Sequence, residues 1–121
     1  MRRFYLGLAV FLSLGCFTLA STFIEKKTVK QVMKAGFAGD SSLCKKVVTG
    51  EASDDEKKAF LDLLVDLVEN DAPKGDEVQW KMQSGKALLA AAKVVAGREG
   101  AAAELKEATN CKACHDVFKG K

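Results

Sequence analysis

The sequence predicts an all-α domain with an antiparallel up-down-up-down four-helix bundle. Apolar residues recur in steps of three and four through most of the chain after residue 20, and no window alternates as a strand does. Short links containing glycine separate these stretches, and Pro73 is the single proline. Helices joined by short links pack as antiparallel neighbours, and such bundles build their sites from side chains on facing helices.

Residues 1–20 have the composition of an export signal. Two arginines precede an apolar run that ends in small residues, which predicts cleavage after Ala20 and a mature domain of residues 21–121. The run is also close to the minimum length that spans a bilayer, so an uncleaved anchor facing the periplasm is the alternative. Cys16 suggests lipoprotein processing more weakly, because Ser13 occupies the place where leucine is usual. We expect a periplasmic protein that meets a membrane only if the leader is retained.

Four main helices and one short helical segment are expected in the mature domain. Ser53 and Glu56 form a capping-box pattern at the start of the second main helix. The expected helices are residues 22–37, 54–69, 76–97 and 101–118, with the short segment at 42–48. The apolar positions expected on their inner sides are Val29, Val32, Met33 and Phe37, then Phe60, Leu63, Leu64, Leu67 and Val68, then Val78, Met82, Gly85, Leu89, Ala92 and Ala96.

The charge balance argues against nucleic acid as a partner. Removal of Arg2 and Arg3 with the leader lowers the number of Lys and Arg from 19 to 17, against 16 Asp and Glu, so the formal charge falls from +3 to +1. No sustained basic stripe with interleaved aromatic residues is present.

The segment Cys111-Lys112-Ala113-Cys114-His115 is the C-x-x-C-H pattern that attaches c-type haem. On a helix, the two cysteines are three residues apart and the histidine follows at i+4 from Cys111, so the three side chains share one face. The two thiols then form thioethers to the porphyrin edge, and the imidazole of His115 reaches the iron. The pattern predicts one covalently bound haem c.

Two other uses of the cysteine pair fit the sequence less well. A thioredoxin-like C-x-x-C motif belongs at the start of a helix in a βαβ unit, and a four-cysteine zinc site needs a second pair. His115 is the sole histidine, and apart from Cys16 only Cys44 remains, so a closed zinc site lacks ligands and a disulfide framework is excluded. A dithiol redox protein without haem stays as a third hypothesis.

Met33 is the expected second axial ligand of the iron. In an antiparallel bundle the end of the last helix lies beside the start of the first, where Met33 is on the apolar side. A histidine and a methionine give six-coordinate iron with a raised reduction potential, which suits electron transfer between partner proteins. The alternatives are that Met33 is a core residue, that Met82 ligates instead, or that the iron is five-coordinate and binds NO or CO.

Several other residues have open interpretations. Trp80 either packs on the porphyrin, donates its indole N–H to a propionate, or is ordinary bundle packing. Cys44 is either a redox thiol or a small buried apolar residue. Acidic residues of the second main helix are expected on its solvated face. Lysines near the haem end are expected either to attract an acidic redox partner or only to keep the surface hydrated. These sets are Asp54, Asp55, Glu56, Asp62, Asp66 and Glu69, and Lys26, Lys30, Lys34, Lys112 and Lys119.

Catalysis is not expected. Peroxidase-type chemistry needs an acid/base group beside an open iron position, and His115 is already assigned to the haem motif.

The haem motif together with Val32-Met33-Lys34 resembles the class II cytochromes c, a family that includes cytochrome c′ and its low-spin relatives. The resemblance implies a four-helix bundle with haem near the C-terminus. It also implies that Met33 is the sixth ligand, as in low-spin members, whereas high-spin cytochrome c′ binds small gases. Many members carry an arginine early in the first helix near the propionates, where this chain has Lys26, Lys27 and Lys30. Bundles of this kind pair through an exposed helix face, so a homodimer is a further expectation.

Overall fold

The computed structural model describes residues 25–120, and over this range the fold is all-α without strands, as the sequence predicts. The leader, with its cleavage site and Cys16, lies outside the described residues. In chain order the elements are α1 (Val29–Val32), the π-helical turn η1 (Met33–Phe37), α2 (Leu43–Thr49), α3 (Asp54–Glu69), α4 (Glu77–Val95), α5 (Ala101–Ala108) and α6 (Cys111–Phe118).

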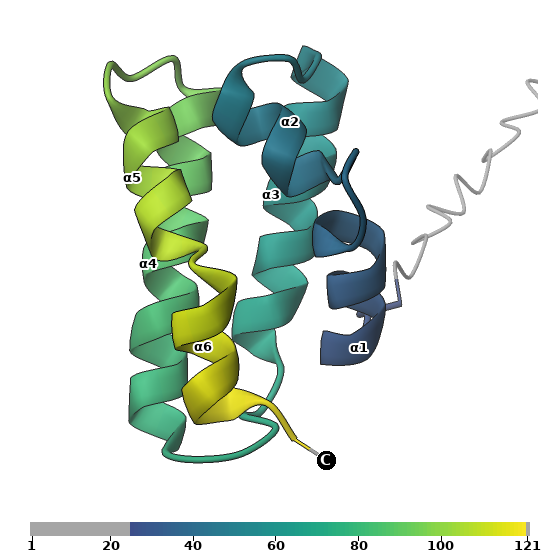
Figure 1. The fold of residues 1–121 in the computed structure, drawn as a ribbon, viewed down its shortest axis with the longest axis vertical. Coiled ribbons are helices and arrows are strands. Elements are labelled where there is room, and N and C mark those ends of the chain that lie inside the picture. The colour runs from purple at the N-terminus through teal and green to yellow at the C-terminus, as the bar shows by residue number, and fades with distance from the viewer. Residues whose placement is uncertain (1–24, 121) are drawn as a thin grey trace, which may run out of the picture.

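The two long helices form the scaffold of the domain. Figure 1 shows α3 and α4 side by side and antiparallel, with α5 packed along α4 and α6 continuing from α5 toward the C-terminus. The α1–η1 segment packs on the other side of α3, and α2 packs against both α3 and α5. The two ends of the described chain thus lie on the flanks of one helix pair.

Polar side chains set where the helices begin. Thr28, Ser42, Ser53, Asp76 and Asn110 each accept a hydrogen bond from the backbone N–H three residues later, as N-cap residues do. The predicted helix 54–69 is confirmed with the same bounds, and its capping box is present.

The first helix begins later than predicted. Thr28 and Gln31 form a capping box, so the helix starts at Val29 and residues 25–28 precede it. Residues 22–24 of the predicted helix lie outside the described part. The prediction missed this start because it weighed apolar spacing and overlooked the cap.

The last predicted helix, 101–118, is broken. α5 ends at Ala108, and Asn110 caps a new helix, α6, through a hydrogen bond from the N–H of Ala113 (3.1 Å). The hydroxyl of Thr109 donates to the Leu105 carbonyl (2.6 Å), which satisfies an acceptor at the end of α5. The haem motif therefore occupies a short helix of its own.

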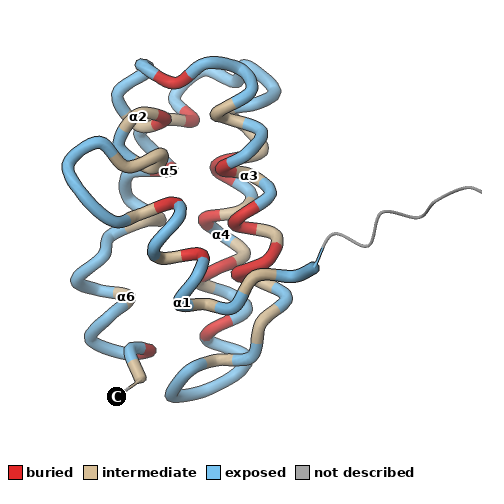
Figure 2. Tube along the Cα trace, turned by 90° about the vertical axis from the view of Figure 1, so that its right-hand side faces the viewer, coloured by how far each residue is buried: buried red, intermediate tan, exposed pale blue. Residues whose placement is uncertain are grey.

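The predicted apolar stripe of α4 is in the wrong register. Val78, Met82 and Leu89 are 66%, 59% and 58% exposed. The buried face instead consists of Trp80, Ser84, Ala87, Ala90 and Ala91. Figure 2 shows the buried positions of the helices in red. Small side chains on this face let α4 approach α3 closely, so packing favours the alanines over the larger residues of the competing stripe.

The face of α3 is predicted well except at two residues. Phe60, Leu63, Leu64 and Leu67 are buried, as expected, and Val68 is half-buried. Asp66, assigned to the solvated face, is buried, and its carboxylate accepts a hydrogen bond from the Lys27 backbone N–H (3.3 Å). A buried carboxylate requires such a partner.

The η1 turn approaches α3 at Gly36. A Cβ atom on this residue would lie 3.0 Å from Leu63 Cδ1 and 3.6 Å from Phe60 Cε2. Phe37 packs edge-on against Phe60, with ring centroids 5.5 Å apart. Because glycine has no side chain, the η1 turn packs directly against α3 at Gly36.

We expect Gly36→Ala to lower the free energy of unfolding by about 1–2 kcal/mol, because overpacking costs about 1–3 kcal/mol and the helical gain from alanine returns up to about 1. Gly85→Ala in α4 is the matched control, since nothing lies within 4 Å of its added Cβ. This control should be neutral or stabilising by up to about 1 kcal/mol. Denaturant unfolding of both variants measures the difference, and equal effects would contradict this account of Gly36.

Candidate functional site

Four segments that are distant in sequence line one hollow, in which the space that a water molecule can enter is about 40 Å³. η1 contributes Met33 and Phe37, and α6 contributes Cys111, Cys114 and His115. α3, α4 and the end of α5 supply most of the remaining residues. The complete lining is Met33, Phe37, Leu67, Trp80, Gln83, Ser84, Ala87, Ala108, Thr109, Asn110, Cys111, Cys114 and His115.

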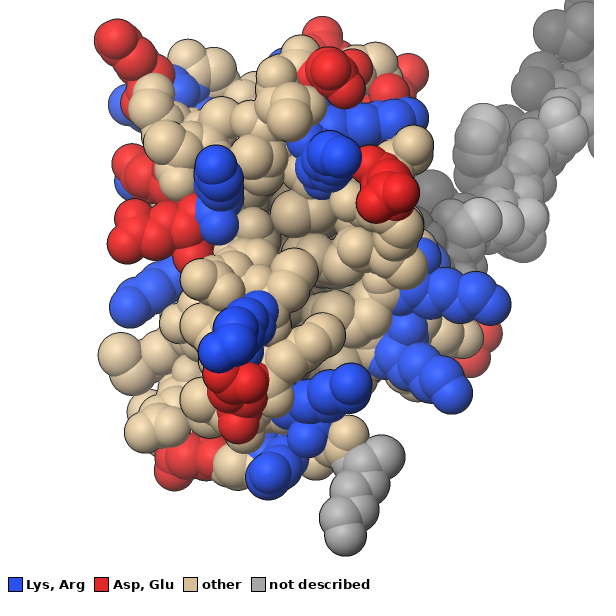
Figure 3. Space-filling model, viewed as in Figure 1, with Lys and Arg blue, Asp and Glu red and all other residues tan. Residues whose placement is uncertain are grey.

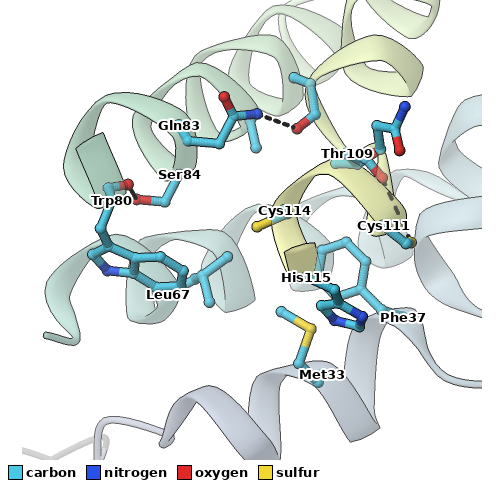
Figure 4. A pocket seen from close by; sticks show the side chains of 13 residues that line it. Met33, Phe37, Leu67, Trp80, Gln83, Ser84, Thr109, Cys111, Cys114 and His115 are labelled. Carbon is cyan, nitrogen blue, oxygen red and sulfur yellow. Dashed lines mark hydrogen bonds between the residues drawn. The ribbon is translucent and has the colours of Figure 1, made fainter. Parts of the chain in front are cut away.

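The hollow brings together all four residues that the sequence proposes for the haem site. Cys111, Cys114 and His115 line it from α6, and Met33 lines it from η1 (Figure 4). Met33 is half-buried, at the first position of the π-helical turn. Single π-helical turns within helices occur frequently at functional sites. The competing candidate, Met82, is on the exposed side of α4 and does not line the hollow.

The two cysteines of the motif differ in environment. Figure 4 shows the sulfur of Cys114 directed into the hollow, whereas Cys111 is exposed and lies 3.6 Å from the Thr109 carbonyl oxygen. Burial raises the pKa of Cys114, and the neighbouring charge of Cys111 raises it further. His115 is exposed. The motif therefore forms one wall of the hollow and is reached from solvent.

The polar side chains of the lining are already hydrogen-bonded. Ser84 donates to the Trp80 carbonyl (2.6 Å), and Gln83 donates through Nε2 to the Ala108 carbonyl (3.2 Å). With these groups satisfied, the interior presented to a ligand is mainly hydrocarbon and aromatic surface. No sequence pattern marks Gln83, Ser84, Ala87 or Ala108 as site residues, and only their packing in the fold identifies them.

Trp80 is part of the lining, but its indole is not free to bind a propionate. Its Nε1–H donates to the Asn70 carbonyl (2.9 Å), and the side chain is 2% exposed. The ring packs edge-on against Phe118, with centroids 5.3 Å apart. The interpretation that the Trp80 indole N–H binds a haem propionate is therefore wrong. The buried ring instead forms part of the apolar lining of the hollow.

Cys44 is half-buried and lies next to Thr109, which lines the hollow. Its thiol donates to the Thr109 hydroxyl oxygen (3.5 Å), and burial raises its pKa despite that hydrogen bond. Among the described residues all cysteines are unbridged. Cys44 packs against the core but is only partly buried, whereas a fully buried residue was expected.

Lysines border the site. Figure 3 shows lysine side chains over α1 and near the end of α6, on the face that these elements share. Lys30, Lys34 and Lys119 are exposed. Lys112 pairs with Asp116 (3.6 Å), and Lys26 donates to the Glu69 carbonyl (3.3 Å), so both are partly engaged.

A bare metal ion has no site in residues 25–120, because no three His, Cys, Asp or Glu side chains there are grouped to hold one. Within the same range, every helix is too short or too polar to cross a bilayer. Comparisons with family models, curated proteins and solved structures gave no match to this chain.

In the folded chain we expect Cys44 to react with an alkylating reagent more slowly than in the denatured chain at the same pH. The thiolate is the reactive form, and a raised pKa reduces its fraction near neutral pH. The rate should therefore reach its half-maximum at a higher pH in the folded chain. Mass spectrometry of the Cys44 peptide measures the rate, and equal rates in both states would contradict the burial of this thiol.

Proposed function

We propose that this chain is a monohaem c-type cytochrome that transfers electrons between partner proteins. Cys111 and Cys114 hold the haem covalently, and His115 and Met33 are the axial ligands of its iron. One observation supports this most strongly: Met33, which the haem motif alone does not predict, lines the same apolar hollow as that motif.

The residues of the hollow fit haem c in their chemistry. Two thiols and an imidazole occupy one short helix, a thioether comes from a second element, and the remaining lining is mainly apolar. Porphyrin itself provides four nitrogen ligands, so the protein needs to supply only two axial groups and no closed cluster of ligands.

Each residue has a defined task in this proposal. The S–H groups of Cys111 and Cys114 add across the two vinyl groups of haem, which forms two thioethers without a leaving group. Bound haem supplies a reversible one-electron change between Fe(II) and Fe(III). The thioether of Met33 favours a raised reduction potential. Phe37, Leu67 and Trp80 exclude water from the hollow.

The helix arrangement agrees with a four-helix bundle of the class II cytochrome type. In this interpretation α1–η1, α3 and α4 are three of its helices, and α5 with α6 together form the fourth. The chain's axial pair corresponds to the low-spin members of that family, which it resembles in its two motifs.

Haem is attached to c-type apoproteins after export, and the pattern of residues 1–20 supports export to the periplasm, with the leader either cleaved or kept as an anchor. Exposed lysines beside the hollow favour redox partners with acidic surfaces. No catalytic residue is assigned, because His115 is committed to the iron and no second histidine exists.

Covalent attachment is tested by replacing both motif thiols. When the chain is expressed with a c-type haem attachment system, Cys111→Ser combined with Cys114→Ser should lose all haem from the denatured polypeptide, since no thioether can form. Cys44→Ser is the matched control and should retain one haem per chain by intact mass. Haem that stays with the double variant after denaturation would contradict the assignment.

The sixth ligand is tested by Met33→Ala, with Met82→Ala as the control. Loss of the thioether should convert the oxidised iron from low to high spin, remove the sulfur-to-iron absorption band and lower the reduction potential. Met82 is exposed and outside the hollow, so its variant should keep the wild-type spectrum. An unchanged spectrum in Met33→Ala would overturn this ligand and favour the gas-binding alternative.

A further inference from the structure

Side chains at the C-terminal end of α3 form hydrogen bonds with the segment that precedes α1. Asn70 donates through Nδ2 to the Lys27 carbonyl (2.8 Å) and to the Asp66 carbonyl (2.7 Å). The Asp66 carboxylate accepts from the Lys27 N–H (3.3 Å). Both backbone groups of Lys27 are therefore bound to one turn of α3.

Asn70 also contacts the wall of the hollow through its main chain. Its carbonyl accepts hydrogen bonds from the Trp80 indole N–H (2.9 Å) and from Lys81 Nζ (2.8 Å). A single residue thus joins the start of the first helix to the tryptophan that lines the site. These main-chain bonds remain when the Asn70 side chain is replaced.

Met33 depends on this attachment for its position. The capping box at Thr28 follows directly after Lys27, and Met33 is the first residue beyond the four-residue helix α1. A helical segment this short is not stable alone and takes its position from tertiary contacts. The segment also contacts α3 through α1 itself, where Val32 is fully buried, and at Gly36 on the other side of Met33. Met33 therefore lies between two points of attachment to α3.

We propose that Asn70 is a positioning residue for the sixth iron ligand: its side-chain amide fixes Lys27, and through it the α1–η1 segment, so that Met33 stays directed toward His115. The inference rests on the proposed axial pair of His115 and Met33. Asn70 touches neither ligand and acts only by holding the segment that carries one of them.

The test compares Asn70→Asp with Ser53→Ala in the haem-loaded protein. Asn70→Asp keeps the size of the side chain but removes the donor to the Lys27 carbonyl. Ser53→Ala removes one capping hydrogen bond at the opposite end of the same helix, far from Lys27. The readouts are the sulfur-to-iron band and the equilibrium constant for replacement of Met33 by carbon monoxide in the reduced protein.

We expect Asn70→Asp to weaken the band and to raise the replacement constant about threefold to tenfold. Of the two hydrogen bonds that this variant loses, only the one to the Lys27 carbonyl joins α3 to the segment that carries Met33. Ser53→Ala should match the wild type in both readouts. If the aspartate variant does not fold, Asn70→Ala replaces it, because alanine places no carboxylate opposite the two carbonyls.

Failure of this inference is distinguishable from failure of the proposed function. If the wild type has the band and the Asn70 variants change no more than Ser53→Ala, the positioning role is overturned while the axial pair stands. If the wild type lacks the band, the axial pair is overturned and the positioning role falls with it.

Discussion

The close antiparallel packing of α3 and α4 is the constraint on which the other elements depend. Ala87, Ala90 and Ala91 of α4 are almost fully buried, and their small side chains let the two helix backbones approach. Trp80 is also buried and fills the space near the N-terminal end of α4. Neither α1–η1 nor α6 is long enough to be stable alone. α1–η1 packs against α3, and α6 is held by the contact of Phe118 with Trp80 of α4, so the pair sets the spacing between the two ends of the described range.

The candidate site follows from that arrangement. Met33 and the Cys111–His115 motif come from opposite ends of the described range, and they line one hollow together with residues of α3 and α4. The break between α5 and α6 changes the direction of the chain just before the motif, because Asn110 caps a new helix that begins at Cys111. The resulting hollow has a sulfur and an imidazole from different elements and an otherwise mainly apolar lining. Such a lining limits water around a bound redox group, and hydration is one of the factors that set a haem potential.

Local signals in the sequence were sufficient for part of this account. The capping box at Ser53 gave the start of α3, and the spacing of Cys111, Cys114 and His115 identified the motif without any structure. Met33 followed from topology, since antiparallel helices bring the first and last together.

Other features needed the folded chain. The Ala-rich α4 offers two apolar stripes, and only packing against α3 decides that Trp80 rather than Met82 faces inward. Asp66 was misplaced because its partner, the Lys27 N–H, is supplied by a distant segment. The cap at Asn110 was readable in principle, but the continuous apolar spacing around it favoured one long helix.

The most direct test of the central claim is the visible to near-infrared absorption spectrum of the exported protein, oxidised and reduced, with and without carbon monoxide. The account predicts a low-spin haem spectrum with a sulfur-to-iron band in the oxidised state, and carbon monoxide that binds the reduced iron only in competition with Met33. A high-spin spectrum that shifts when carbon monoxide is added would contradict the histidine–methionine pair and favour gas binding. Absence of haem absorption from protein made with an active attachment system would contradict the cytochrome assignment itself.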